Sequence, residues 1–216
     1  IEGPKQMFER VAILVAIPDI LHDSVLFDLN GRHAQNINEA TLYYSKTEDF
    51  HLKLKIGEYL LNKYHFESLI RVYIDLAEQG HMKLSFRQLL KLVAEGKLSA
   101  YEQKIREYYD LMISRDFLPN TPTLMNAGTR LGQLSACFVL EMPDDMYGIM
   151  KSSTDAAMIF KSGGGVGINY SDLRPEGDIV ASTSGVASGP TSFMRIIDTV
   201  TDVVKQGGKR RGANMG

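Results

Sequence analysis

Apolar residues in the first half of the chain recur every three or four positions, which is the spacing of one face of a helix. One stripe, followed by Gly80 in the position of a helix C-cap, consists of Leu69, Ile70, Tyr73 and Leu76. A second stripe consists of Leu52, Ile56, Leu60 and Leu61. Residues 1–115 are also poor in glycine, so the pattern predicts antiparallel helices over this whole stretch.

The first helix is bounded by two prolines. Pro4 suits a first helical position, where its missing N–H has no helical partner to lose. The apolar pattern that follows consists of Met7, Val11, Leu14 and Val15. Pro18 is expected to end this helix, because proline disrupts the backbone hydrogen bonds of a helix interior.

Two capping boxes predict two later helices. Ser85 and Gln88 stand three residues apart before a short apolar pattern, and Gly96 follows it as a stop signal. Ser99 and Glu102 repeat the spacing. The apolar positions after them are Ile105, Tyr108, Tyr109, Met112 and Ile113.

The pattern changes near residue 116. Later apolar runs are short and separated by turns, at residues 135–140, 165–170 and 179–181. Two helical patterns lie between and after them, over about 145–160 and about 191–204. Strands alternating with helices predict an α/β sheet, so we expect a helical region at 1–115 and an α/β region at 116–216.

Composition excludes several classes of protein. Hydrophobic residues make up 44% and charged residues 23%, as in ordinary globular domains. The formal charge is −2, from 24 Lys+Arg and 26 Asp+Glu, so a duplex DNA or membrane partner is not expected. No apolar run approaches the ~20 residues of a membrane span. A single cysteine, Cys137, and no visible secretory signal indicate a reduced, cytoplasmic context.

No metal site is predicted. A zinc site made of several thiolates is excluded by the single cysteine. The five histidines share no metal-ligand spacing, and each is expected to be a surface or packing residue.

Four features of the second half can carry chemistry. Cys137 lies within LSACFVL, and a lone cysteine in a strand is more often a core residue than a reactive one. KSGGGVG has too many glycines for a simple helix cap, yet a helix precedes it, which is the wrong order for a dinucleotide fingerprint. KQGGKRRG places cations on a glycine loop after a predicted helix. These cations either bind phosphate or interact favourably with the dipole at the carboxyl end of the helix. FLPNTPTLMNAG is either a rigid capped loop or a binding loop.

Taken in order, these motifs resemble the catalytic subunit of ribonucleotide reductase over about residues 114–216, and weakly over PKQMFERV in the helical half. The stretches that carry the resemblance are FLPNTPTLMNAG, LSACFVL, KSGGGVGINYSDLRPEGD, GVASGPTSFMRIID and KQGGKRRGANMG. The glycine pattern and the basic loop are most similar to the adenosylcobalamin-dependent class II enzymes, although some class I subunits share much of the same sequence in these motifs. The resemblance implies a helical N-terminal region followed by the first part of a ten-stranded α/β barrel.

The resemblance also implies roles at the substrate. Cys137 matches one of two cysteines that deliver electrons to the ribonucleotide and become a disulfide. A thiyl radical on another cysteine starts that reaction, which makes 2′-deoxyribonucleotides for DNA replication. The residues that match substrate contacts are Thr121, Ala136, Cys137 and Gly165.

A second set of residues matches an allosteric site for a deoxynucleotide. The segment that holds its base and sugar is matched by Asp144, Asp145 and Met146, and the phosphate positions by Lys161 and Arg174. Two specificity loops are matched by residues 174–187 and 206–213, the second with Gln206, Lys209 and Arg210. Because Arg174 precedes Pro175, its backbone is expected to be extended.

The resemblance implies several cofactors and partners. They are adenosylcobalamin (or a radical from a separate di-iron subunit), a deoxynucleoside triphosphate effector, ATP, a second copy of the enzyme in a homodimer, and a thioredoxin-like reductant. The reaction needs at least three cysteines and this chain has one. We therefore expect the chain to be an incomplete N-terminal portion that lacks the rest of the barrel and is inactive alone.

The two ends fit that expectation, since there is no initiator Met and the sequence stops in an open glycine-containing stretch. The alternative is a stand-alone nucleotide-binding regulatory module without catalysis.

Overall fold

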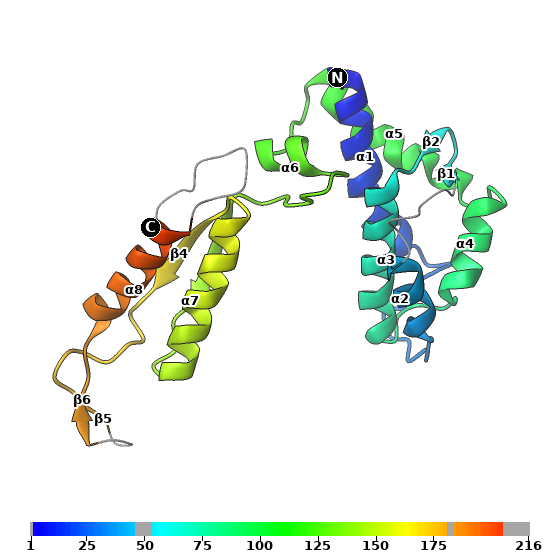
Figure 1. Ribbon diagram of the computed structural model, residues 1–216. Helices are drawn as coiled ribbons and strands as arrows, with labels where there is room; N and C mark the ends of the chain where they lie inside the picture. The colour runs from blue at the N-terminus through cyan, green and yellow to red at the C-terminus, as the bar shows by residue number, and fades with distance from the viewer. Residues whose placement is uncertain (1, 46–52, 181–183, 205–216) are drawn as a thin grey trace. The chain divides into compact units, whose positions relative to one another are not determined.

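The computed structural model describes residues 2–45, 53–180 and 184–204. The chain forms two units, Ile1–Leu134 and Ser135–Gly216, each with its own hydrophobic core. The first is called the helical unit below and the second the barrel segment (Figure 1). None of the helices in the described ranges is long and apolar enough to cross a membrane.

The helical unit is built around α1, which packs against α3, α5 and α6. Its helices are α1 (Pro4–Leu21), α2 (Ile37–Ser45), α3 (Lys63–Glu78), α4 (Phe86–Ala94), α5 (Glu102–Ser114) and α6 (Thr121–Asn126). The predicted stripe on α3 is confirmed, because its members are all buried. The rings of Tyr73 and Phe86 lie 5.0 Å apart, centroid to centroid, in this core.

The capping box at the start of α4 is also confirmed. The Gln88 N–H donates to Ser85 Oγ at 3.3 Å, and the Ser85 N–H donates to Gln88 Oε1 at 2.8 Å. Both exchanges satisfy N–H groups that have no partner inside the helix. Gly80 and Gly96, the predicted stop residues, follow α3 and α4 with φ of 82° and 69°.

Pro18 does not end the first helix, which continues to Leu21. The proline is exposed, whereas Ile17, Ile20 and Leu21 beside it are buried in the core. Loss of one backbone hydrogen bond in the last turn is outweighed by the burial of these apolar side chains. The Pro18 carbonyl in turn accepts a hydrogen bond from the His22 N–H at 2.9 Å.

The stripe at residues 52–61 is not helical. In the described part of this stretch, β1 (Lys55–Ile56) and β2 (Tyr59–Leu60) form an antiparallel hairpin. Gly57 takes a φ of 60° in the turn, which a helix does not permit.

Ser99 does not cap α5. It begins a 3₁₀ turn, Ser99–Tyr101, in which the Tyr101 N–H donates to the Leu98 carbonyl at 3.0 Å. Helix α5 therefore starts only at Glu102.

The boundary between the units lies after Leu134 and not at residue 115/116. Helix α6 packs on α1, and Ala127 is fully buried in the first core. The Thr123 hydroxyl donates to the Leu134 carbonyl at 3.0 Å and so holds the end of the segment on the helical unit. The glycines and prolines that suggested an earlier boundary belong to this packed loop.

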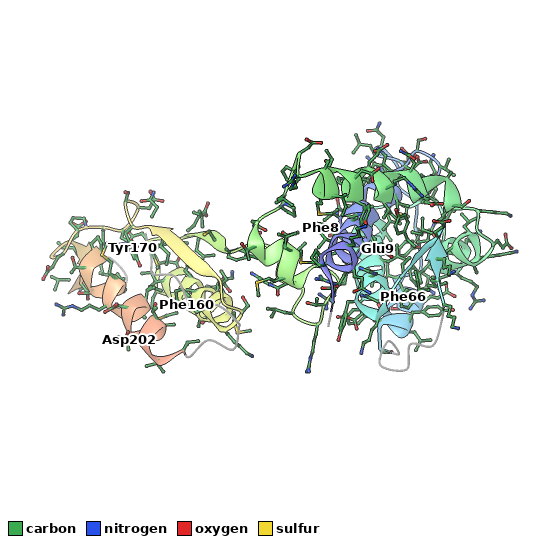
Figure 2. The ribbon with its side chains drawn as sticks, turned by 90° about the horizontal axis from the view of Figure 1, so that it is seen from above. Phe8, Glu9, Phe66, Phe160, Tyr170 and Asp202 are labelled. Carbon is green, nitrogen blue, oxygen red and sulfur yellow. The ribbon has the colours of Figure 1, made fainter. Side chains whose placement is uncertain are left out.

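The barrel segment contains a β-α-β unit. Strand β3 (Cys137–Glu141) pairs in parallel with β4 (Gly165–Asn169), and α7 (Met146–Lys161) connects them. The hairpin β5 (Ile179–Val180) and β6 (Gly185–Val186) follows, and then α8 (Pro190–Val203), which packs beside α7 (Figure 1). Phe160, labelled in Figure 2, is fully buried in the core that α7, α8 and the two strands share. The predicted helices and the α/β alternation are confirmed.

Candidate functional site

Three of the four predicted substrate residues lie side by side at the amino ends of β3 and β4. Cys137 is directly opposite Gly165 in the parallel register. The Gly165 N–H donates to the Ala136 carbonyl at 2.6 Å. The Cys137 side chain is exposed, so the expectation that a lone cysteine in a strand is core does not hold for it.

The glycine run positions these strands. After α7, Gly163 takes a φ of 84°, which turns the chain toward β4. A Cβ on Gly164 would lie 2.7 Å from Ile159 Cγ2 and 3.0 Å from the Phe138 ring. Two glycines thus serve the turn and the close packing, and Gly165 stands opposite the cysteine.

Thr121, the fourth substrate residue, belongs to the helical unit and is exposed at the first position of α6. Asn120 caps this helix, because its Oδ1 accepts the Thr123 N–H at 3.0 Å and the Thr123 hydroxyl at 2.6 Å. The NTPT sequence is therefore a rigid helix start. That is the capped-loop alternative, and it keeps Thr121 in one place.

At the other end of the β-α-β unit, Asp144 meets Arg174. Asp144 follows β3 and Arg174 follows β4, so both lie beyond the carboxyl ends of the strands. Arg174 Nε donates to Asp144 Oδ2 at 2.7 Å, and the Arg174 backbone N–H donates to Oδ1 at 3.3 Å. The hydrogen bond from Arg174 is the main reason that the pKa of Asp144 lies below its usual value.

Asp145 and Met146 begin α7 beside this pair. Asp145 is the N-cap, and its Oδ1 accepts the Gly148 N–H at 2.9 Å. Met146 is exposed at the first helical position. Ser152 fixes the helix to the strand, since its buried hydroxyl donates to the Glu141 carbonyl at 2.6 Å.

Lys161 is not part of that group. It is exposed at the last position of α7, about 22 Å along the helix axis from Met146 at ~1.5 Å per residue. Within one chain, Lys161 therefore lies at the Cys137 and Gly165 end of the β-α-β unit. Gln206, Lys209 and Arg210 lie outside the described residues.

The sequence placed Asp144 and Arg174 in one site without indicating their direct contact, and it gave no sign of the contacts of Arg10. The Asp144–Arg174 pair depends on the register of β3 and β4, which no local pattern specifies. Arg10 donates to backbone carbonyls at the carboxyl end of α6, at Leu124 and Ala127. The sequence pattern around Arg10 predicts its own helix but not this contact with a distant segment. In the residues that the structure describes, no three His, Cys, Asp or Glu side chains are grouped as metal ligands.

Comparison with known families matches both units. The description "Ribonucleotide reductase, all-alpha domain" matches residues 1–132, and "Ribonucleotide reductase, barrel domain" matches residues 135–216. These ranges divide at the same place as the two structural units.

Curated proteins that are similar to this chain are named as reductases of the same family. A "Vitamin B12-dependent ribonucleoside-diphosphate reductase" of Thermoplasma acidophilum is 44% identical over 100% of this chain and 26% of its own length. A protein of the same name from Mycobacterium tuberculosis is 52% identical over 66% of this chain and 22% of its own length. A "Ribonucleoside-diphosphate reductase large subunit" of Arabidopsis thaliana is 36% identical over 98% of the chain and 25% of its own length.

The chain thus spans about a quarter of the length of these relatives. Its helical unit and its barrel segment each match a domain of one family. The chain belongs to the ribonucleotide reductase family, as part of the large subunit, and the two vitamin B12-dependent relatives named above are 44% and 52% identical to it.

Proposed function

We propose that this chain is the part of a vitamin B12-dependent reductase that carries one reducing cysteine and the effector-binding residues. The whole enzyme would convert ribonucleotides, as diphosphates by analogy with the names of the relatives, to 2′-deoxyribonucleotides. The observation that carries the proposal is the exposed Cys137 thiol at the start of β3, directly opposite Gly165. A thiol there is open to a substrate that lies across the ends of two strands.

Cys137 would act as one half of a dithiol. Reduction of the ribose takes two electrons and two protons, which two thiols supply as they become a disulfide while the 2′ oxygen leaves as water. The second cysteine of the pair and the radical cysteine would lie in parts of the enzyme outside these residues, since the chain has one cysteine. A thioredoxin-like dithiol would then restore the pair.

Small residues support a substrate position beside Cys137. Ala136 and Gly165 add little side-chain bulk beside the thiol, and their mutual hydrogen bond holds the strand ends in register, with Gly165 itself buried. Independently of that position, and on the resemblance alone, Thr121 is proposed to bind the nucleotide through its hydroxyl. Its fixed place at the start of α6 suits hydrogen bonding to a polar group of the nucleotide.

Adenosylcobalamin is the proposed cofactor, and when bound it would supply the radical that starts the reaction. The barrel segment does not itself offer metal-ligating side chains for a corrinoid. Residues 135–216 contain no histidine, the commonest metal-ligating side chain, and Cys137 is taken by the reducing role. The roles proposed for this chain therefore concern the nucleotide, and none of them involves the corrinoid.

The effector site would be completed by a second copy of the enzyme. Asp144, Asp145, Met146 and Arg174 gather at one end of α7, and Lys161 stands at the other. An antiparallel two-fold pairing of α7 helices would bring Lys161 of one copy to the Asp144 end of the other. The effector sugar would then meet Asp144, and its phosphates Arg174 and Lys161.

The exposed face of α7 supports this pairing. Met146, Met150 and Met158 lie on one i, i+4 row and are 64%, 48% and 59% exposed, and Tyr147 beside them is 80% exposed. Such a methionine-rich apolar face is suited to burial against another helix. A homodimer interface on α7 would place the effector at the interface.

The test measures two properties. The complete enzyme, with adenosylcobalamin and a dithiol, should reduce ribonucleoside diphosphates, and the chain alone should yield no deoxynucleotide above a no-protein control. Calorimetric titration of a deoxynucleoside triphosphate should show binding that requires the dimer. Effector binding without any activity in the complete polypeptide would instead support a regulatory module without catalysis. Turnover by the chain alone would refute the cysteine assignment.

A further inference from the structure

Arg10 of α1 holds the last turn of α6. Its guanidinium donates to the Leu124 carbonyl at 3.1 Å and also to the Ala127 carbonyl. The same guanidinium binds the Glu2 carboxylate through two hydrogen bonds, of 2.7 Å and 2.9 Å. The Arg10 side chain is only 13% exposed, so these partners largely fix its position. A cation at the carboxyl end of a helix also satisfies carbonyls that have no partner within that helix.

Two residues at the start of α3 hold the chain just after α6. Asn62 Nδ2 donates to the Gly128 carbonyl at 3.0 Å. His65 accepts the Asn62 N–H at Nδ1, 3.1 Å away, and donates from Nε2 to the Arg10 carbonyl at 2.9 Å. Gly128 itself leaves no room for a side chain, because a Cβ would lie 2.5 Å from His65 Nε2 and 2.8 Å from Arg10 Cγ. The carboxyl end of α6 is therefore seated against α1 and α3.

We propose that Arg10 is a positioning residue for Thr121, and so for the substrate, acting through α6. The inference rests on the proposed function, which places Thr121 at the nucleotide. Helix α6 spans only Thr121–Asn126, and backbone hydrogen bonds join its two ends. The Leu124 N–H donates to the Asn120 carbonyl at 3.2 Å and the Ala127 N–H to the Thr123 carbonyl at 2.9 Å, so a shift at the end that Arg10 holds is passed to Thr121. The Arg10 contacts at Leu124 and Ala127 thus determine where the Thr121 hydroxyl lies.

Loss of Arg10 would leave two carbonyls without their charged donor and allow α6 to shift. The chemistry at Cys137 uses groups on β3 and β4, which Arg10 does not contact among the described residues. We therefore expect substrate binding to weaken more than turnover at saturation. A displacement of about 1 Å in a positioning group can cost on the order of 100-fold in rate, so a change of ten-fold or more is measurable.

The experiment compares KM and kcat of the complete reductase in four variants. Arg10→Met removes the charge and keeps the apolar stem. Arg10→Lys keeps the charge but cannot reach two carbonyls and a carboxylate together. Thr121→Ala removes the proposed contact, and Arg87→Met is the matched control, since Arg87 forms an exposed pair with Glu39 at 2.8 Å. The double variant Arg10→Met with Thr121→Ala completes a thermodynamic cycle.

The proposal expects the KM for ribonucleotide to rise about ten-fold or more in Arg10→Met, less in Arg10→Lys, and not in Arg87→Met. The rise in Arg10→Met should largely disappear when Thr121 is already alanine, because the two residues act through one contact. Amide hydrogen exchange over residues 121–128 should become faster in both Arg10 variants, without a change over α3 after its first turn.

Contrary results distinguish a failure of the role of Arg10 from a failure of the substrate role of Thr121. An unchanged KM in folded Arg10→Met, or effects of Arg10→Met and Thr121→Ala that simply add, overturns the role of Arg10. If Arg10→Met does not fold, Arg10→Lys decides, and an unchanged KM in that variant has the same meaning. An unchanged KM in Thr121→Ala removes the substrate role of Thr121, and with it both the proposed site and the inference.

Discussion

The two units of this chain differ in the exposure of one chemically active side chain each. In the helical unit, His65 is buried and both of its ring nitrogens are bonded to backbone groups. In the barrel segment, Cys137 is exposed on β3, and Val139 on the same strand is 85% exposed. The helical unit thus buries its histidine in a neutral, fully bonded state, whereas the barrel segment exposes its cysteine thiol.

The difference also appears in the hydrophobic cores. The helical core draws on all six helices and the β1–β2 hairpin, and it buries large rings such as Tyr73 and Phe86. The core of the barrel segment gathers around Phe160 between α7, α8 and two strands. A two-stranded parallel sheet ordinarily requires cover on both faces, so we expect the exposed residues of β3 to be covered in the complete barrel. Four experiments test this difference between the helical unit and the barrel segment.

The largest effect is expected at Cys137. In the complete enzyme, Cys137→Ser should abolish multiple turnover, because a hydroxyl is similar in size but cannot form a disulfide. Deoxynucleotide formation with a dithiol reductant measures it, with Ser135→Ala as a control two residues away on the same approach to β3. Undiminished multiple turnover in Cys137→Ser would end its assignment as an electron donor.

A smaller but global effect is expected from His65 in acid. Burial lowers the pKa of His65 to about 4, against a usual value of 6.5, so the folded state keeps the ring neutral. As the pH falls below about 6.5, the unfolded chain binds a proton that the folded chain does not, and the free energy of unfolding decreases. The loss should reach about 2 kcal/mol near pH 5 and about 3 kcal/mol near pH 4, where the folded state begins to be protonated.

Urea unfolding of the helical unit between about pH 7.5 and pH 5 measures this loss, in a range above the usual titration of carboxylates. The control is His65→Gln, which removes the titrating ring and should flatten the pH dependence while lowering stability at all pH values. An equal slope in both proteins would show that His65 is not the group responsible. The barrel segment has no histidine, so its unfolding should change little in this range.

These contacts show how far the sequence alone specifies the molecule. Local signals predicted what local physics controls, such as the stripe on α3 and the Ser85 capping box. They failed where tertiary packing determines the end of an element. Helix α1 continues past Pro18 because the residues around the proline are buried in the core. They also failed at residues 55–60, where apolar residues at helical spacing flank a turn that needs the positive φ of Gly57.

The candidate site divides in the same way. The resemblance singled out Cys137 and Gly165 for one site and Asp144 and Arg174 for another, and the strand pattern around the glycine run implied the β-α-β unit. The contact of Asp144 with Arg174 requires the register of two strands, and that of Arg10 with α6 requires the packing of distant helices. Neither relation has a periodic or local signature.

A change of intermediate size is expected at Arg174. Arg174→Ala should weaken binding of a deoxynucleoside triphosphate by about 1.5–3 kcal/mol, the range for a hydrogen bond to a charged group. The variant also leaves Asp144 without its cation, which adds repulsion toward a phosphate. Calorimetry on the complete enzyme measures the affinity, and Arg195→Ala, at an exposed arginine of α8, is the control. Effector-dependent choice of substrate should be blunted with basal turnover largely intact, and an unchanged effector affinity would remove Arg174 from the site.

The smallest effects compare one helix cap from each unit. Ser85 caps α4 in the helical unit by a reciprocal exchange with Gln88, and Asp145 caps α7 in the barrel segment by accepting the Gly148 N–H. Replacing either cap by alanine should cost about 1 kcal/mol, because an N–H of the first helical turn loses its acceptor. Ser85→Thr and Asp145→Asn keep an acceptor and should recover most of the loss.

Since each unit has its own core, hydrogen exchange should show Ser85→Ala destabilising the helical core, and Asp145→Ala destabilising α7 and the strands beside it. If either variant lowered protection equally in both units, the two would unfold as one cooperative body, and the contrast between the buried His65 and the exposed Cys137 would have no counterpart in stability.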